Sequence, residues 1–273
     1  MRPDPLPADL ARALTDASTR LGPFGRVEYF ADVDSTNTRA LERATRGAPH
    51  GLVVIAEAQR AGRGRQGRAW FSPAGAGLYM SVLLRERAWA GALSLVTLAA
   101  GVATARGLSA ATGLAPELKW PNDVVIGRPW RKIAGILAES VTAGARIDAV
   151  VVGIGVNLRK SAFPTEIADR ATAVEMETDR VVEGTACVVE ILAALARVTS
   201  DLSAGRGADV VRAFRALSAT GLGGAPVRWT DATGPRRGVA RDIDDTGALL
   251  VDSEGRRERL FSGEVQWERL SRD

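Results

Sequence analysis

The stretch that decides the fold is "LKWPNDVVIGRPWRKIAGILAESVTAGARIDAVVVGIGVNL", residues 118–158. It contains three runs rich in β-branched residues, separated by glycine, proline and polar residues, which is the pattern of successive strands. The residues between the first two runs, "GRPW" at 127–130, suit a hairpin connection. Strands joined this tightly pair antiparallel, because a parallel pair needs a crossover of a dozen or more residues. The stretch therefore predicts an α+β fold and not a doubly wound one.

The flanking segments alternate between helix and strand patterns. Helices are expected at 5–20, 34–47, 91–113 and 183–220 (interrupted at 203–209), and strands at 26–32, 51–58 and 77–84. From about Gly221 the sequence changes to short apolar runs between Gly, Asp and Pro turns, which suits a β-barrel of about 50 residues. We therefore predict two domains: residues 1–221, with a mixed, mainly antiparallel sheet flanked by helices, and residues 222–273, a small β-barrel.

The composition argues against several kinds of active site. One histidine, His50, and one cysteine, Cys187, leave no material for a His-based triad, a zinc cluster or a disulfide framework. The net charge of +4 is mild and both signs are interspersed, so it does not by itself indicate nucleic-acid binding. No signal peptide is visible. The most apolar run, 90–105, is shorter than the about 18 residues of a membrane span and is predicted to be a buried helix. A cytoplasmic location is expected.

Lysine is rare in this chain, where only Lys119, Lys132 and Lys160 occur among 36 basic residues. A lysine retained against this bias is a candidate for a role that needs lysine, although three residues can also be chance. Lys132 begins the apolar run "KIAGIL" (132–137), where a lysine usually extends into solvent. The scarcity of lysine favours a functional role instead.

The segment "KWPNDV" (119–124) gathers polar residues between two β runs. Pro121 fixes the backbone there and biases the preceding residue to an extended conformation. Lys119, Asn122 and Asp123 can then converge on one anionic, metal-bearing ligand. Each residue alone is more often a surface or turn residue, but the cluster favours a binding site.

A loop rich in arginine and glycine, "AGRGRQGRAW" at 61–70, follows an apolar strand. Its cations, with the residue just before it, are Arg60, Arg63, Arg65 and Arg68. Glycine lets the backbone approach a ligand closely, and arginine offers forked donors to phosphate or carboxylate. The loop lacks the Lys-Ser/Thr ending of a Walker loop, and no helix follows its G-x-G-x-x-G spacing. A solvated turn or an RNA-contacting segment is the alternative, but four arginines beside Trp70 favour an anion site. We expect mutual repulsion to keep the empty loop mobile.

Two further motifs are ambiguous on their own. "DSTN" (34–37) is by itself best explained as a helix cap, although a helix start can also hold a polar ligand. "GIGVNL" (153–158) ends a strand with two glycines, for which a bulge is the simpler interpretation and close approach of a ligand the alternative.

Taken together and in this order, "DSTN", "QRAGRGRQGRAW", "KWPND", "KIAGIL" and "GIGVN" resemble the biotin protein ligase family over residues 34–158. The C-terminal segment is similar to the family's SH3-like domain, and the resemblance implies a class II synthetase-like catalytic domain. It also implies two reactions. Biotin and ATP give biotinyl-5′-adenylate and pyrophosphate, and a lysine of a biotin carboxyl carrier domain of an acyl-CoA carboxylase then takes the biotinyl group. About 33 residues precede "DSTN", too few for the helix-turn-helix of some members, so no specific DNA binding is expected.

The resemblance assigns roles residue by residue. Ser35, Thr36 and Gln59 are expected to hold the ureido end of biotin, and Arg63, Gly64 and Arg65 to contact biotin and its mixed anhydride. Lys132 is expected at the carboxylate of biotin, Lys119 at the α-phosphate, Trp70 against adenine, and Asn122 and Asn157 near the nucleotide. Arg63, Lys119 and Lys132 are the expected catalytic residues. The full expected binding set is Ser35, Thr36, Asn37, Gln59, Gly62, Arg63, Gly64, Arg65, Arg68, Trp70, Lys119, Asn122, Lys132, Gly135, Gly155 and Asn157.

Magnesium is expected with the phosphates of ATP. A monomer or weak homodimer that binds no membrane is also expected. Lipoate–protein ligase is the nearest rival because its chemistry is similar, but the "GRGRQGR" and "KWPND" pair favours biotin. A nucleic-acid-binding module is the alternative of another class. It is disfavoured because one basic loop stands alone, without an aromatic-rich RNA-binding motif.

Overall fold

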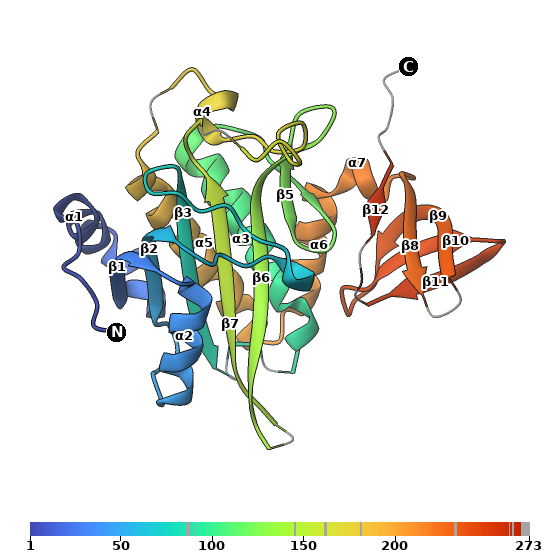
Figure 1. Ribbon diagram of the computed structural model, residues 1–273. Coiled ribbons are helices and arrows are strands. Elements are labelled where there is room, and N and C mark those ends of the chain that lie inside the picture. Colours follow the sequence, from blue (N-terminus) through green and yellow to red (C-terminus); the bar gives the residue numbers. More distant parts are fainter. Residues whose placement is uncertain are drawn as a thin grey trace.

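A large sheet forms the centre of the molecule, with the C-terminal strands in a second, smaller sheet beside it (Figure 1). The computed structural model describes residues 1–85, 88–89, 91–144, 146–160, 163–180, 182–231, 234–261, 263 and 265–268. The large sheet has seven strands in the order β1-β2-β3-β7-β6-β5-β4. They are β1 (Val27–Val33), β2 (Val53–Gln59), β3 (Gly77–Arg85), β4 (Glu117–Lys119), β5 (Asp123–Ile126), β6 (Arg131–Ala143) and β7 (Arg146–Asn157).

Pairing in this sheet is antiparallel except between β1 and β2, which run parallel. The hairpin predicted at 127–130 joins β5 to β6, and β6 continues directly into β7. The predicted α+β class, with a mixed and mainly antiparallel sheet, is confirmed. The first predicted run, 118–127, is in fact two strands, because the chain reverses at Trp120–Asn122 through a cis Trp120–Pro121 peptide and pairs β4 with β5.

Helices cover the sheet on both faces (Figure 1). They are α1 (Ala8–Asp16), α2 (Thr36–Thr45), α3 (Val96–Thr112), α4 (Val174–Glu177), α5 (Gly184–Ser203), α6 (Gly207–Leu217) and α7 (Ala219–Leu222). Successive residues of a strand point to opposite faces. Even-numbered residues such as Met80 and Ile154 pack in one core with α3 and α5, whereas Leu83 and Val151 pack with α2. The face covered by α2 is the one that carries the site described below.

The most apolar helix of the chain is a core helix. The helix that contains most of the run at 90–105 extends over Leu93–Thr112, which is long and apolar enough to cross a membrane, but it is buried in the protein, as predicted. Of its most apolar 18 residues, 67% are buried inside the protein, and the helix packs mainly against α5. At Gly107 a Cβ would lie 2.6 Å from the Ile191 backbone, so glycine is what allows this close helix packing.

The C-terminal sheet docks against the turn between β4 and β5. It contains β8 (Pro226–Asp231), β9 (Gly234–Ile243), β10 (Leu249–Ser253), β11 (Arg256–Leu260) and β12 (Gln266–Trp267), all paired antiparallel. Trp120 Nε1 donates to Gly247 O at 2.9 Å, and Trp267 Nε1 donates back to Trp120 O at 3.2 Å. The tryptophan of "KWPND" is therefore fixed by the C-terminal sheet.

Candidate active site

Three glycines form a hollow at the centre of the large sheet, on the face towards α2. Gly135 of β6 lies opposite Gly155 of β7, and Gly153 lies two pairs further along, opposite Leu137. A Cβ on Gly155 would be 2.5 Å from the Trp70 ring, and one on Gly153 would be 2.3 Å from Asn37 Oδ1. The two glycines of "GIGVN" therefore mark close approach of side chains, and the alternative of a bulge does not hold.

The start of α2 supplies the polar floor of this hollow. Ser35, Thr36 and Asn37 are all at most 4% exposed. The simple cap that "DSTN" suggests is absent, since the Ser35 side chain makes no capping bond. Instead Gln59, at the end of β2, accepts from Thr36 N at 2.8 Å, and its Nε2 donates to Ser72 Oγ at 2.9 Å.

An inner cavity of about 50 Å³ lies over this floor. Trp70 restricts it, because its ring lies across Gly135 and Gly155 and fills the space that their missing side chains leave. Trp70 Nε1 is buried and has no hydrogen-bond partner among the described residues. Lys132 Nζ lies 5.3 Å from the centre of the ring, within the range of a cation–π contact. The indole ring of Trp70 therefore occupies the space above the two glycines.

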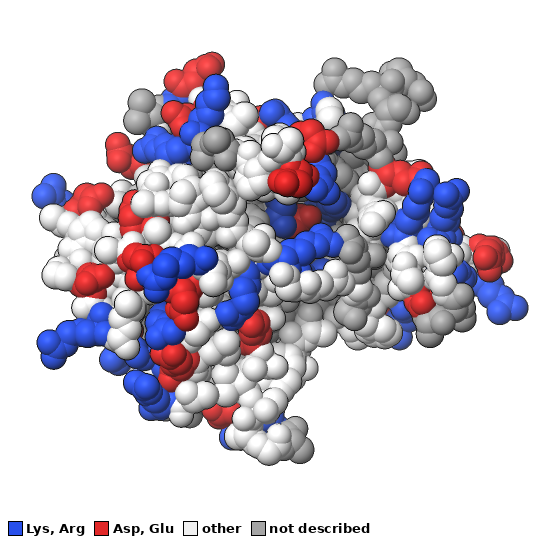
Figure 2. Space-filling model, in the orientation of Figure 1, with Lys and Arg blue, Asp and Glu red and all other residues white. Residues whose placement is uncertain are grey.

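An outer cavity of about 740 Å³ adjoins the inner one and extends to the C-terminal sheet. Cations gather around this hollow in the middle of the face shown in Figure 2. Aromatic rings of Trp120, Trp130 and Trp267 form its far wall. The inner cavity is thus small and polar, and the outer one is wide, cationic and aromatic.

One carboxylate holds the two lysines that line the outer cavity. Lys132 Nζ lies 2.5 Å from Asp123 Oδ1, and Lys119 Nζ lies 3.9 Å from Asp123 Oδ2. Burial alone would raise the pKa of Asp123, but Lys132 and Lys119 outweigh it, so this pKa is below its ordinary value. Burial lowers the pKa of Lys119 below its ordinary value. The charge of Asp123 raises this pKa, and the charges of Lys132 and Arg170 lower it further. Two lysines thus share one carboxylate, which leaves a net positive charge on this wall of the outer cavity.

The arginine loop crosses the sheet in front of β6 and β7 (Figure 1). Its arginines do not simply repel one another, as the sequence suggested, because the protein supplies partners. Arg60 pairs with Asp32, Arg63 Nη2 donates to Glu139 Oε2 at 2.9 Å, and Arg65 Nη1 donates to Asn122 Oδ1 at 3.1 Å. Arg65 Nη2 also donates to Gly263 O of the C-terminal part at 3.2 Å. Mobility of the loop stays a prediction.

The two asparagines predicted near the nucleotide, Asn122 and Asn157, hold other site residues in place. Asn122 donates from Nδ2 to Ile136 O at 2.8 Å while its oxygen accepts from Arg65. Asn157 Nδ2 donates to Thr172 O at 2.9 Å and to Lys132 O at 3.4 Å. Thr172 N donates in turn to Lys132 O at 3.0 Å, so the backbone of Lys132 is fixed from two sides.

The structure brings the predicted residues together around the two cavities. The inner cavity is lined by Ser35, Thr36, Asn37, Gln59, Arg63, Gly64, Arg65, Trp70, Asn122, Lys132, Gly135 and Gly155. The outer cavity adds Arg68, Lys119 and Asn157. Gly62 lines neither, and its role is close packing, since a Cβ there would be 2.5 Å from Trp70 O.

Sequence reasoning missed three residues that belong to the site. Tyr79 and Ser81 of β3 and Glu139 of β6 share the face of the sheet on which the predicted Gly135 and Gly155 lie. Residues two apart in a strand share a face, so this alternation was the available signal. It becomes usable once the register of the strands is known.

The described residues contain no group of three or more His, Cys, Asp and Glu that could hold a metal ion. Asp123 is the carboxylate nearest both lysines, and it is already neutralised by them. The residues present therefore do not form a protein-built metal site. The expectation that Lys119, Asn122 and Asp123 of "KWPND" converge on an anionic, metal-bearing ligand stays a prediction.

Comparison with known proteins agrees with this geometry. Residues 29–157 match the biotin/lipoate A/B protein ligase family, and residues 222–267 match the biotin protein ligase C-terminal domain. The fold and site thus define a protein ligase of the biotin/lipoate class. A biotin–[acetyl-CoA-carboxylase] ligase of Paracoccus denitrificans is 36% identical, covering 86% of this chain and 98% of its own.

A second relative and a solved structure narrow the class. The biotin–[acetyl-CoA-carboxylase] ligase of Mycobacterium tuberculosis is 35% identical over 93% of this chain and 94% of its own length. The biotin protein ligase of Aquifex aeolicus, solved with biotin and ATP, is 28% identical with a TM-score of 0.77, covering 89% of this chain and 99% of that one. The chain belongs to the biotin protein ligase family.

Proposed function

We infer that the protein is an ATP-dependent biotin–protein ligase. The observation that carries this is a buried polar floor continuous with a wide cationic cavity. A ureido group has two N–H donors and a carbonyl acceptor, and so matches a floor of hydroxyl and amide side chains. Ser35, Thr36 and Gln59 are proposed to hold that group, with biotin's chain directed past Trp70 towards Lys132.

In the first reaction, a carboxylate oxygen of biotin attacks the α-phosphorus of ATP, and pyrophosphate leaves. Catalysis of such a transfer depends on positioning and charge neutralisation more than on a protein nucleophile. Lys132 and Arg63 are proposed to orient the attacking carboxylate, and Lys119 to stabilise negative charge on the α-phosphate. Substrate anions would replace Asp123 as the partner of both lysines, which its place between them supports.

In the second reaction, the amine of an acceptor lysine attacks the acyl carbon of the adenylate, and AMP leaves. Gly64 and Arg65 are proposed to close over the anhydride and limit its hydrolysis by water. Trp70 is proposed to leave the hollow over Gly135 and Gly155 and pack against adenine. Arg68, Asn122 and Asn157 are proposed to lie on the nucleotide side.

Lipoate is the competing substrate because its ligases share the family description. A dithiolane ring has no N–H or carbonyl, so it would leave the buried floor at Thr36 and Asn37 without ligand hydrogen bonds. The polar floor therefore favours biotin. Binding to nucleic acid has less support, because Arg60, Arg63 and Arg65 already pair within the protein.

Several finer assignments accompany the activity. We propose that residues 1–221 form the catalytic domain and 222–273 the C-terminal domain, although α7 spans that boundary and residues 269–273 lie outside the described part. The proposed acceptor is a biotin carboxyl carrier domain of an acyl-CoA carboxylase. Mg²⁺ is proposed to arrive on the phosphates of ATP and to neutralise part of their charge. A cytoplasmic monomer or weak homodimer, without specific DNA or membrane binding, completes the proposal.

The direct test is incubation with biotin, ATP, Mg²⁺ and a carrier domain, followed by mass spectrometry of the carrier. We expect one biotinylated lysine and no product when a carrier with that lysine changed to arginine is used. Lipoate in place of biotin should give no modification above background. Efficient lipoylation, or no transfer to any carrier domain despite adenylate formation, would overturn the assignment.

A further inference from the structure

A chain of polar contacts links the floor of the inner cavity to its mouth. It starts at Gln59, which accepts from Thr36 N at 2.8 Å. Ser81 Oγ continues it, lying 2.7 Å from Thr36 Oγ1 and 2.6 Å from Asn37 Oδ1. Asn37 then donates from Nδ2 to Glu139 Oε2 at 2.6 Å. The chain ends on a carboxylate of β6 to which the reaction described above gives no role.

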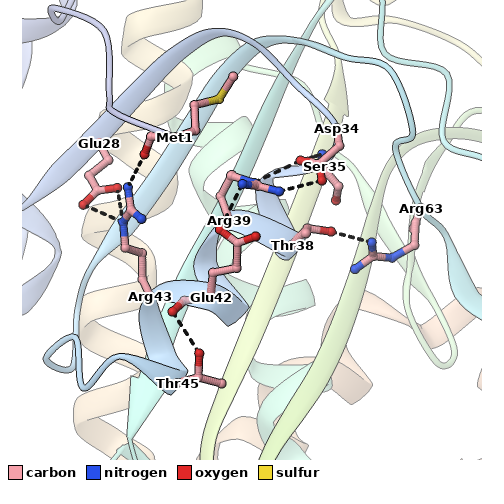
Figure 3. A network of polar contacts seen from close by, with 10 residues as sticks. All are labelled: Met1, Glu28, Asp34, Ser35, Thr38, Arg39, Glu42, Arg43, Thr45 and Arg63. Atoms are coloured by element: carbon pink, nitrogen blue, oxygen red, sulfur yellow. Dashed lines mark hydrogen bonds and ion pairs between the residues drawn. The ribbon is translucent and has the colours of Figure 1, made fainter.

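The same carboxylate is the anionic partner of Arg63. Arg63 Nη2 lies 2.9 Å from Oε2 and 3.2 Å from Oε1 of Glu139. Arg63 Nη1 donates to Thr38 Oγ1 of α2 at 2.6 Å, as Figure 3 shows. The guanidinium is therefore fixed at two points while it lines the inner cavity.

Arg63 needs such support because its own segment restrains it little. Gly62 and Gly64 flank it, and glycine leaves the backbone more conformations than any other residue. Glu139, by contrast, is on a central strand, where it pairs with Val151 of β7. A carboxylate on a rigid strand can therefore reduce the conformational freedom that Arg63 would otherwise lose when it binds a ligand.

We propose that Glu139 is a positioning residue for biotin, holding Arg63 at the mouth of the inner cavity and Asn37 at its floor. One carboxylate then orients the side chains that meet both ends of the ligand. This inference rests on the proposed function, since it assigns the ligand of Arg63. Glu139 itself does not contact the reacting atoms, so we expect its main effect on biotin affinity and a smaller one on the chemical step, through Arg63.

The test compares Glu139→Gln with the wild-type protein in biotin-dependent pyrophosphate release. The glutamine keeps the size and one acceptor for Asn37, but loses the charge that holds Arg63. Loss of one charged hydrogen bond corresponds to about a tenfold rise in KM for biotin. We expect kcat at saturating biotin to change less than about threefold, because Arg63 still reaches a bound ligand.

Three controls make the outcome decisive. Glu42→Gln removes a carboxylate that pairs with Arg39 on the exposed side of α2, and should leave KM unchanged. In an Arg63→Ala background, Glu139→Gln should add almost nothing, because Arg63 is gone and the glutamine still accepts from Asn37. Glu139→Asp keeps the charge and should restore part of the affinity. Thermal unfolding of each variant shows whether the protein remains folded.

The results distinguish failure of the proposed ligase function from failure of the positioning role of Glu139. If the wild-type protein releases no pyrophosphate with biotin, the proposed function fails. If it does so and the folded Glu139 variants keep the wild-type KM, or have a lower one, the positioning role is refuted while the function stands. Equal losses from Glu139→Gln with and without Arg63 would also refute it.

Discussion

Asp123 is the residue whose removal should disturb the site most before any substrate is bound. In Asp123→Asn, Lys132 and Lys119 lose the carboxylate that lies 2.5 and 3.9 Å from their Nζ atoms. Breaking a fully buried pair costs about 3–5 kcal/mol, and an exposed pair about 0–1 kcal/mol. The Asp123 side chain is 24% exposed, so we expect an intermediate loss of about 2 kcal/mol in the free energy of unfolding.

The stability difference between wild type and Asp123→Asn should depend on pH in a definite direction. Because the pKa of Asp123 is lowered in the folded protein, its contribution is present at neutral pH. That contribution is lost as pH falls below the ordinary value of 3.8 towards the folded pKa. Wild type and Asp123→Asn should therefore differ most near pH 7 and converge in acid. Urea unfolding at several pH values measures the difference.

Two additional measurements separate this effect from general damage. Asp209→Asn removes an exposed ion pair with Arg212 and should cost less than about 0.5 kcal/mol. Tripolyphosphate should raise the melting temperature of Asp123→Asn more than that of wild type, because it replaces the missing negative charge. If Asp123→Asn loses no more stability than Asp209→Asn, or gains nothing from tripolyphosphate, the account of the two lysines is wrong.

Two other predictions concern the packing of the Trp70 ring and the titration of Lys119. Gly155→Ala places a methyl group 2.5 Å from the Trp70 ring and should destabilise the protein by about 1–3 kcal/mol, measured by urea unfolding. In a Trp70→Ala background the same change should cost almost nothing, and an equal cost in both backgrounds would contradict the packing described. The pKa of Lys119 is lowered, so its ammonium group should lose its proton at a pH below the value of about 10.4 typical of lysine. The rate of adenylation should fall as the pH rises through that lowered pKa. Lys119→Arg, which does not titrate there, should lose that decline, and an unchanged pH profile would exclude Lys119 as its source.

Local patterns in the sequence were sufficient for much of the fold. The β-branched runs and the "GRPW" connection predicted the β5–β6–β7 meander, because hairpin pairing depends on residues close in the chain. The reversal at Pro121 was not predicted, since one apolar run and two short strands have the same composition. The buried helix predicted at 91–113 is α3, although the length and composition of such a helix alone also suit a membrane span.

Site residues were predictable where a sequence motif marks them. They were not predictable where their role depends on partners far away in the chain. Gly155 could indicate a bulge or a close contact, and only the position of Trp70 decides between them. Glu139 stands in an ordinary strand, and its partners Asn37 and Arg63 are 102 and 76 residues away. Contacts over such separations depend on register and strand order, which a single sequence does not reveal.

The central claim is that one ligand spans both cavities, with its bicyclic end on the buried floor and its nucleotide beside the two lysines. A crystal structure with a non-hydrolysable analogue of biotinyl-5′-adenylate tests this most directly. We predict the ureido group within hydrogen-bond distance of Thr36 or Gln59, and the phosphate near Lys119. An analogue bound elsewhere, with Lys119 and Lys132 still paired to Asp123, would contradict the account.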